Sequence, residues 1–178
     1  MLNKQSMVYW DACVFQSYIE GIPDRLPVLD AMLQAVQHNQ QSVIVTSTVS
    51  ITEVAYVSAE RANQRLRSEV EQAIDTLWAQ RDVIWLIEYS EHIAKEARQL
   101  IRASVTKGWR LRSHDAVHLA SAKHLGVARF YTYDRTLFKY SALVDFPIGE
   151  PQVDQPSLIL PIDFSASSGP QTRRESEP

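Results

Sequence analysis

Four acidic residues, spread over most of the chain, each lie where a regular element is expected to begin or end. Asp11 follows an apolar run, and Glu53 lies one turn into a helix expected after a β-branched strand. Asp115 opens a helix of small residues, and Asp134 follows a short strand. In an open parallel sheet, strand ends and the helix starts after them gather at one edge, where ligands bind. We therefore expect the four carboxylates to meet there.

Electrostatics indicates what such a cluster would do. Two carboxylates about 5 Å apart repel each other by roughly 3 kcal/mol at an effective dielectric near 20. A cluster of four persists only if it takes up protons or a divalent cation, and hard oxygen donors suit Mg²⁺ or Mn²⁺. Asp11, Glu53, Asp115 and Asp134 are therefore candidate catalytic and metal-binding residues.

Each carboxylate also has a structural interpretation. Glu53 follows Ser50 by three residues, which is the spacing of a capping box. Asp115 would be favoured in a first helical turn by the helix dipole, and Asp134 could begin a turn. Asp11 is the exception, because an aspartate among large apolar residues is costly to desolvate unless something binds it.

The elements that must position these residues alternate between strands and helices. Apolar runs predict strands over 7–12, 43–46, 83–87 and 129–132, of which 83–87 is the clearest buried strand. Periodicity predicts helices over 28–38, 47–60 and 62–80, and Leu66 is assigned to the apolar stripe of the third. Two more helices are expected: one capped by Ser90, and one that runs from Asp115 to a closing Gly126. This order predicts an α/β fold, with a mostly parallel central sheet flanked by helices on both faces (α/β/α).

Length and composition limit the remaining possibilities. The 178 residues fit one domain over 1–150, followed by a Pro/Ser-rich tail over 151–178 that is expected to be loosely ordered. No apolar run reaches the length of a membrane span, and the single cysteine favours a reducing cytoplasm. A net charge of −3 argues against a protein that coats nucleic acid by bulk charge, although it permits a local basic patch.

One such patch directly precedes the third acidic residue. Cations there suit phosphate groups, and an aromatic side chain suits a base. The candidate nucleic-acid contacts are Lys107, Trp109, Arg110, Arg112 and, beside the fourth acidic residue, Arg135. The alternative is a solvated loop between helices with its tryptophan buried.

Two histidines have the spacing of metal ligands. His114 and His118 are one helical turn apart, but no second cluster of histidine or cysteine completes a zinc site. We expect surface or packing residues, with His114 lining the cleft beside Asp115.

The four acidic segments, in their order, resemble the PIN domain, a small metal-dependent ribonuclease fold, and in particular the bacterial VapC-type toxins. The segments are YWDACVF (9–15), TVSITEV (48–54), HDAVHLASA (114–122) and FYTYDRTLF (130–138), and the resemblance covers residues 7–147. The chain departs from it at Cys13, where many members have asparagine or a hydroxyl residue. We interpret Cys13 as a small buried apolar residue.

The resemblance implies a metal-dependent endoribonuclease, the toxin of a toxin–antitoxin pair. Asp11, Asp115 and Asp134 would hold Mg²⁺ or Mn²⁺, with Glu53 as a direct or water-bridged ligand. The implied partners are an RNA substrate, an antitoxin protein and a second copy in a homodimer. The alternative is a non-catalytic PIN-like module that binds RNA or protein. A haloacid-dehalogenase-like phosphatase is discounted, since its second aspartate is replaced by Cys13.

Overall fold

The centre of the protein is a parallel sheet, seen in a computed structural model that describes residues 6–39 and 42–153. Five strands lie in the order β3-β2-β1-β4-β5, and each neighbouring pair is parallel. The strands are β1 (Ser6–Trp10), β2 (Ser42–Ser47), β3 (Ile84–Ile87), β4 (Arg129–Tyr131) and β5 (Ile148–Gly149). In the central strand, Tyr9 lies opposite Val45 on one side and Phe130 on the other. The expected parallel sheet is confirmed.

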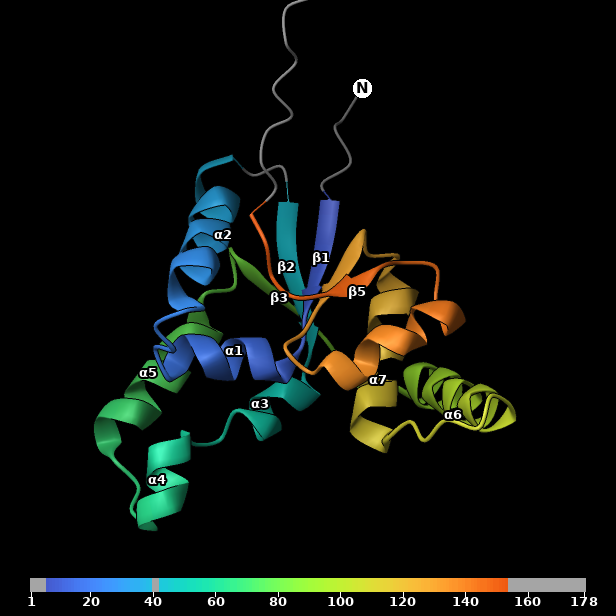
Figure 1. The fold of residues 1–178 in the computed structure, drawn as a ribbon. Helices are drawn as coiled ribbons and strands as arrows, with labels where there is room; N and C mark the ends of the chain where they lie inside the picture. Colours follow the sequence, from blue (N-terminus) through green and yellow to red (C-terminus); the bar gives the residue numbers. More distant parts are fainter. Residues whose placement is uncertain (1–5, 40–41, 154–178) are drawn as a thin grey trace, which may run out of the picture.

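Helices cover both faces of the sheet (Figure 1). One face packs against α1 (Ala12–Ile19), α2 (Leu26–Asn39) and α5 (Ser68–Ala79). The other packs against α6 (Glu91–Thr106), α7 (Ser113–Leu125) and the 3₁₀ helix η1 (Arg135–Leu143). Two short helices, α3 (Val49–Glu53) and α4 (Ser58–Asn63), lie beyond the carboxyl ends of the strands. The α/β/α expectation is confirmed.

The ends of α6 and α7 follow the local sequence. The Ser90 hydroxyl accepts a hydrogen bond from the backbone N–H of Ile93 at 3.4 Å, as expected of an N-cap. Gly126 ends α7 with a φ of 63°, a left-handed conformation that glycine adopts without a steric penalty.

The continuous helix expected over 47–60 is wrong. The helix α3 ends at Glu53, since Val54 has a φ of −94° and a ψ of 60°. Val54 and Val57 are both buried in the core beside α1 and α5, and this packing holds the segment out of a helical path. The chain becomes helical again only at Ser58.

Two further expectations are corrected. The helix expected over 62–80 begins only at Ser68, and Leu66, assigned to its apolar stripe, is 78% exposed. A left-handed Gln64, with a φ of 51°, separates α4 from α5. The strand over 83–87 is not the best buried one: β3 is an edge strand that exposes 50% of Trp85, because it pairs on one side alone, with β2.

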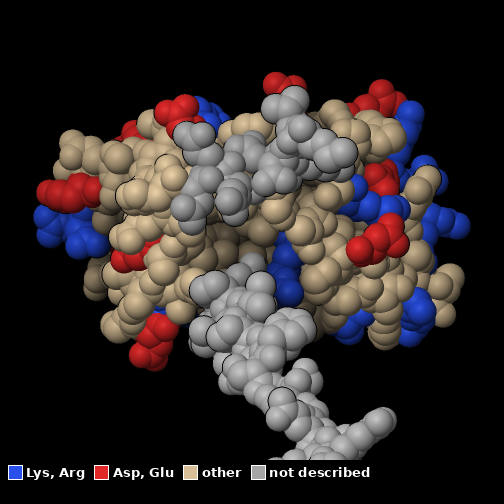
Figure 2. All heavy atoms as spheres, turned by 90° about the horizontal axis from the view of Figure 1, so that it is seen from above, with Lys and Arg blue, Asp and Glu red and all other residues tan. Residues whose placement is uncertain are grey.

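Figure 2 shows the face at the amino ends of the strands, where acidic and basic side chains are interspersed around the rim. No helix of the described residues is both long and apolar enough to cross a membrane. The tail expected over 151–178 lies outside the described residues beyond position 153. The domain boundary at 150 therefore stays a prediction.

Candidate active site

All four expected acidic residues lie at the carboxyl edge of the sheet. Asp11 follows the central strand β1, Asp134 follows β4 beside it, and Glu53 is the last residue of α3, after β2. Asp115 is the third residue of α7. Two cationic side chains link them: His118 reaches Asp11 and Glu53, and Arg112 reaches Asp115 and Asp134.

Asp11 is buried, and both of its carboxylate oxygens accept hydrogen bonds. Oδ1 accepts a hydrogen bond from the backbone N–H of Ala12 at 2.8 Å. Oδ2 accepts one from the Thr132 hydroxyl at 2.8 Å and a longer one from the Cys13 thiol at 3.4 Å. These bonds offset the desolvation of the charge and fix its orientation. Thr132 was not among the expected site residues, although it stands two residues before Asp134.

Glu53 is held by a histidine that sequence analysis assigned to packing or to the surface. His118 is 1% exposed, and its Nε2 lies 2.6 Å from Glu53 Oε2 and 3.7 Å from Asp11 Oδ1. Its Nδ1 lies 2.8 Å from the Tyr9 hydroxyl, which accepts a hydrogen bond from the backbone N–H of Ser47. A buried chain of contacts thus connects Glu53 to the strands β1 and β2.

The capping-box interpretation of Glu53 is wrong. The Ser50 hydroxyl lies 2.7 Å from the Thr46 hydroxyl instead, and the N-cap of α3 is Thr48, with no side-chain hydrogen bond. The Glu53 carboxylate points to His118 and to His114, whose Nδ1 lies 3.4 Å away. Glu53 therefore faces the site.

Protonation of His118 should couple stability to pH. Burial alone would lower the pKa of His118, but its hydrogen bond to Glu53 and the charges of Asp11, Glu53 and Asp115 outweigh burial and raise it above its usual 6.5. The folded protein therefore holds this proton more tightly than the unfolded chain. The stabilisation is complete below pH 6.5 and is lost as pH rises through the raised pKa.

We therefore expect the unfolding free energy of the metal-free protein, measured with urea, to fall as the pH rises above about 6.5. His118→Gln should cost roughly 1–3 kcal/mol at pH 6, because Glu53 loses a charged partner. It should also flatten the pH dependence. His38→Gln is the control, since His38 is exposed and bonds within its own helix. An unchanged pH slope in His118→Gln would contradict this coupling.

Arg112 forms the second link. Its Nε donates to Asp115 Oδ2 at 2.7 Å, and its Nη2 donates to Asp115 Oδ1 at 3.3 Å and to Asp134 Oδ2 at 2.8 Å. Asp134 also caps η1, since its Oδ1 accepts hydrogen bonds from the backbone N–H and the hydroxyl of Thr136. Asp134 thus begins η1, as its structural interpretation expected, and also contacts Arg112 in the site.

The two carboxyls that Arg112 joins titrate differently. Burial raises the pKa of Asp115 above its usual range, with Asp11 and Asp134 adding to this effect and Arg112 opposing it. Burial also acts to raise the pKa of Asp134, but hydrogen bonds from Thr136 and the charge of Arg112 bring it below its usual range. The charged form is therefore disfavoured at Asp115 and favoured at Asp134.

Cys13 is only half-buried, and its thiol makes polar contacts, so the interpretation as a small buried apolar residue is incomplete. Its sulfur lies 3.2 Å from the Thr132 hydroxyl and accepts a hydrogen bond from the backbone N–H of Tyr133 at 3.3 Å. Burial, followed by the charge of Asp11, raises the pKa of the thiol to about 12. Cys13 is thus a protonated thiol at neutral pH that supports Asp11.

The basic segment lies beside the carboxylates with its tryptophan packed. Trp109 meets Tyr140 edge-on at 5.6 Å between ring centroids, and the ammonium groups of Lys107 and Lys139 lie within 6 Å of its ring. This arrangement favours the buried-tryptophan interpretation over a stacking platform for bases. Arg135, at the far side of Asp134, pairs with Glu150 at 2.7 Å.

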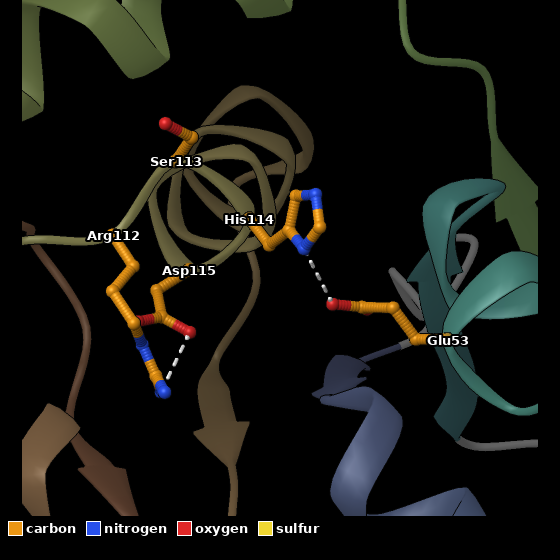
Figure 3. A pocket seen from close by; sticks show the side chains of 5 residues that line it. All are labelled: Glu53, Arg112, Ser113, His114 and Asp115. Carbon is orange, nitrogen blue, oxygen red and sulfur yellow. Dashed lines mark hydrogen bonds and ion pairs between the residues drawn. The ribbon is translucent and has the colours of Figure 1, made fainter.

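A hollow of about 290 Å³ lies between Glu53 and the start of α7 (Figure 3). Its lining is Glu53, Arg112, Ser113, His114 and Asp115, so His114 lines the cleft as expected. In this arrangement no three His, Cys, Asp or Glu side chains of the described residues are placed to share one metal ion. The zinc interpretation of the histidines therefore gains no support, and the carboxylates are instead paired with Arg112 and His118.

This chain belongs to the PIN domain family, whose model matches residues 8–143. No match was found among curated protein sequences. Its fold is that of VapC-type toxin structures, as a comparison with solved structures shows.

Three of these structures illustrate the similarity. VapBC2 from Rickettsia felis, bound to a DNA fragment from its own promoter, is 14% identical, with a TM-score of 0.60 over 83% of this chain and 99% of the other. FitAcB from Neisseria gonorrhoeae is 15% identical, with a TM-score of 0.58 over 82% and 98%. VapC20 from Mycobacterium tuberculosis, a Sarcin-Ricin loop cleaving toxin, is 13% identical, with a TM-score of 0.53 over 76% and 94%.

Proposed function

We propose that this protein is a metal-dependent endoribonuclease that hydrolyses RNA phosphodiester bonds and acts as the toxin of a toxin–antitoxin pair. The observation that carries the proposal is the placement of Asp11, Glu53, Asp115 and Asp134 at the carboxyl edge of a PIN-domain sheet, in two pairs that His118 and Arg112 join. Parallel sheets bind their ligands at this edge.

The residues present fit a divalent cation. Their donors are hard carboxylate oxygens, which suit Mg²⁺ and Mn²⁺. The guanidinium that Asp115 and Asp134 share marks a place where these carboxylates already hold positive charge. Asp11, Asp115 and Asp134 would hold the ion, with Glu53 as a direct or water-bridged ligand. A bound ion of this kind lowers the pKa of a water molecule and stabilises charge on a leaving oxygen.

The chain's own residues would orient the site and the substrate. Thr132 and the backbone N–H of Ala12 fix the carboxylate of Asp11, and His118 fixes that of Glu53. Buried and hydrogen-bonded side chains lose little freedom when a ligand arrives, so the site is largely pre-organised. Arg110 and Lys107 lie exposed on the segment before α7 and would bind phosphate groups of the strand.

The partners are proposed from the similar structures. VapBC2 and FitAcB give the precedent for an antitoxin partner, and the cleaving activity named for VapC20 gives the precedent for RNA. We propose in addition a homodimer and a cytoplasmic location.

The experiment that tests this function separates cleavage from binding. Purified protein is incubated with single-stranded and structured RNAs in the presence of Mn²⁺, and the RNA is analysed on denaturing gels. Defined internal fragments support the nuclease. Retention of RNA in a gel shift, without fragments from any RNA, would support the non-catalytic binding module in its place.

A further inference from the structure

The guanidinium of Arg112 lies where the proposed function requires a divalent cation. It contacts both oxygens of Asp115 and one oxygen of Asp134 at 2.7–3.3 Å. Its side chain is nevertheless 66% exposed, so it reaches the carboxylates from the solvent side. Exposed ion pairs contribute little net stability, and a competing cation can therefore separate them.

A second hollow, of about 320 Å³, adjoins the first. Arg112 and Asp115 line both, and the second is completed by Arg110, Thr136, Lys139 and Tyr140. Neither Arg110 nor Lys139 forms an ion pair with a carboxylate of the described residues. Arg112 thus lies between the carboxylates of Asp115 and Asp134 and a hollow that Arg110 and Lys139 also line.

We propose that Arg112 and the divalent cation occupy the carboxylates of Asp115 and Asp134 in turn. In the metal-free protein Arg112 joins Asp115 to Asp134. When a divalent cation takes these oxygens, the released guanidinium turns to the second hollow and joins Arg110 and Lys139 in binding a phosphate group of the RNA strand. Arginine suits both positions, because its planar fork of N–H donors bonds carboxylates and phosphates alike. Arg112 thus makes strong RNA binding depend on the metal.

The inference rests on the proposed function, and metal affinity tests it without any cleavage assay. The dissociation constant of Mn²⁺ is measured by electron paramagnetic resonance on metal-free wild type, Arg112→Gln, Arg112→Lys and Arg110→Gln. Arg112→Gln removes the competitor and should bind Mn²⁺ about three- to tenfold more tightly. Arg112→Lys, which keeps the charge but cannot bridge both carboxylates, should fall between. Arg110→Gln removes a charge two residues away and should match wild type.

Any of the following outcomes overturns the exchange. Arg112→Gln could bind Mn²⁺ no more tightly than wild type, or Arg110→Gln could tighten binding equally, which would indicate a general effect of charge. If wild type and Arg112→Gln both fail to bind Mn²⁺ at millimolar concentration, the exchange and the proposed metal site fail together. Asp115→Asn is measured in the same way. If it no longer binds Mn²⁺ while Arg112→Gln binds Mn²⁺ as wild type does, the exchange fails and the proposed function stands.

RNA binding supplies an independent readout. The affinity for a short single-stranded RNA is measured by fluorescence anisotropy against salt, first in a chelator and then with Mn²⁺, at times when the RNA is still intact. Each phosphate contact contributes about 0.7 to the slope of log affinity against log salt. In the chelator, Arg110→Gln should lower the slope by about this amount and Arg112→Gln should leave it unchanged. With Mn²⁺ both variants should lower it. A loss of slope in Arg112→Gln without metal would contradict the exchange.

Discussion

Asp11→Asn is expected to lower the rate of RNA cleavage by at least about two to three orders of magnitude, the loss typical of removing one pre-organised electrostatic group. The substitution keeps the shape of the side chain and removes the charge that attracts the cation. The metal-free variant should unfold close to the temperature of wild type, because relief of the repulsion with Asp115 offsets the loss of the acceptor for Thr132 and of the charge beside His118. Single-turnover cleavage and thermal melting measure the two effects.

The matched control is Asp75→Asn, which removes an exposed carboxylate from α5. It should leave both cleavage and melting unchanged. If Asp11→Asn cleaved RNA as fast as Asp75→Asn, Asp11 would have no part in the chemistry. A fall in the melting temperature of Asp11→Asn alone would indicate that the loss of activity reflects misfolding.

Saturating Mn²⁺ or Mg²⁺ is expected to raise the melting temperature by roughly 5–10 °C. A ligand that binds the folded state alone stabilises it by about 2.7 kcal/mol at one hundred times its dissociation constant, and a chain of this size gains about 2–4 °C per kcal/mol. The reason is local: Asp115 lies half-buried next to Asp11 and Asp134, and burial disfavours its charged form. Differential scanning fluorimetry over a range of Mn²⁺ concentrations measures the shift.

Asp115→Asn and Asp11→Asn should abolish this shift, and Asp75→Asn should retain it. Zn²⁺ provides a second comparison, because the histidines offer another site for a softer ion. A shift produced by Zn²⁺ alone, and lost in His114→Ala and His118→Ala, would replace the carboxylate site by a histidine site.

The parts of the site that sequence analysis anticipated are those that depend on local pattern. An aspartate after an apolar run was expected at the end of a buried strand, and the alternation of strands and helices predicted that the strand ends lie at one edge of a parallel sheet. The pairing of β1 with β4 is seen only in the structure. Gly126 and Ser90 marked helix ends for reasons contained within a few residues. Convergence of Asp11 and Asp134 at one edge follows from these signals and the topology of parallel sheets.

The parts that it missed depend on contacts between distant segments. The helix expected over 47–60 breaks because Val54 and Val57 are buried against α1 and α5, and no local propensity encodes that contact. His118 had the spacing of a ligand, but its burial between Tyr9 and Glu53 depends on residues 109 and 65 positions away.

Arg112 was only half predictable. An arginine three residues before an aspartate at a helix start is a neighbour that can pair with it, so the bond to Asp115 could have been inferred. Its second bond, to Asp134, spans 22 positions and two elements. Because of that bond, Arg112, expected to bind RNA phosphate, instead bridges the carboxylates of Asp115 and Asp134 in this structure.

The most direct test of a metal-dependent nuclease is one titration. Cleavage of an end-labelled RNA by the wild-type protein is followed from a chelated, metal-free sample up to millimolar Mn²⁺, and the melting temperature is recorded on the same samples. We predict no cleavage in the chelator and a saturable rise in rate whose midpoint coincides with that of the melting shift, since one site would be responsible for both. Cleavage at an undiminished rate in the chelator, or a melting shift that saturates without any cleavage, would contradict the account.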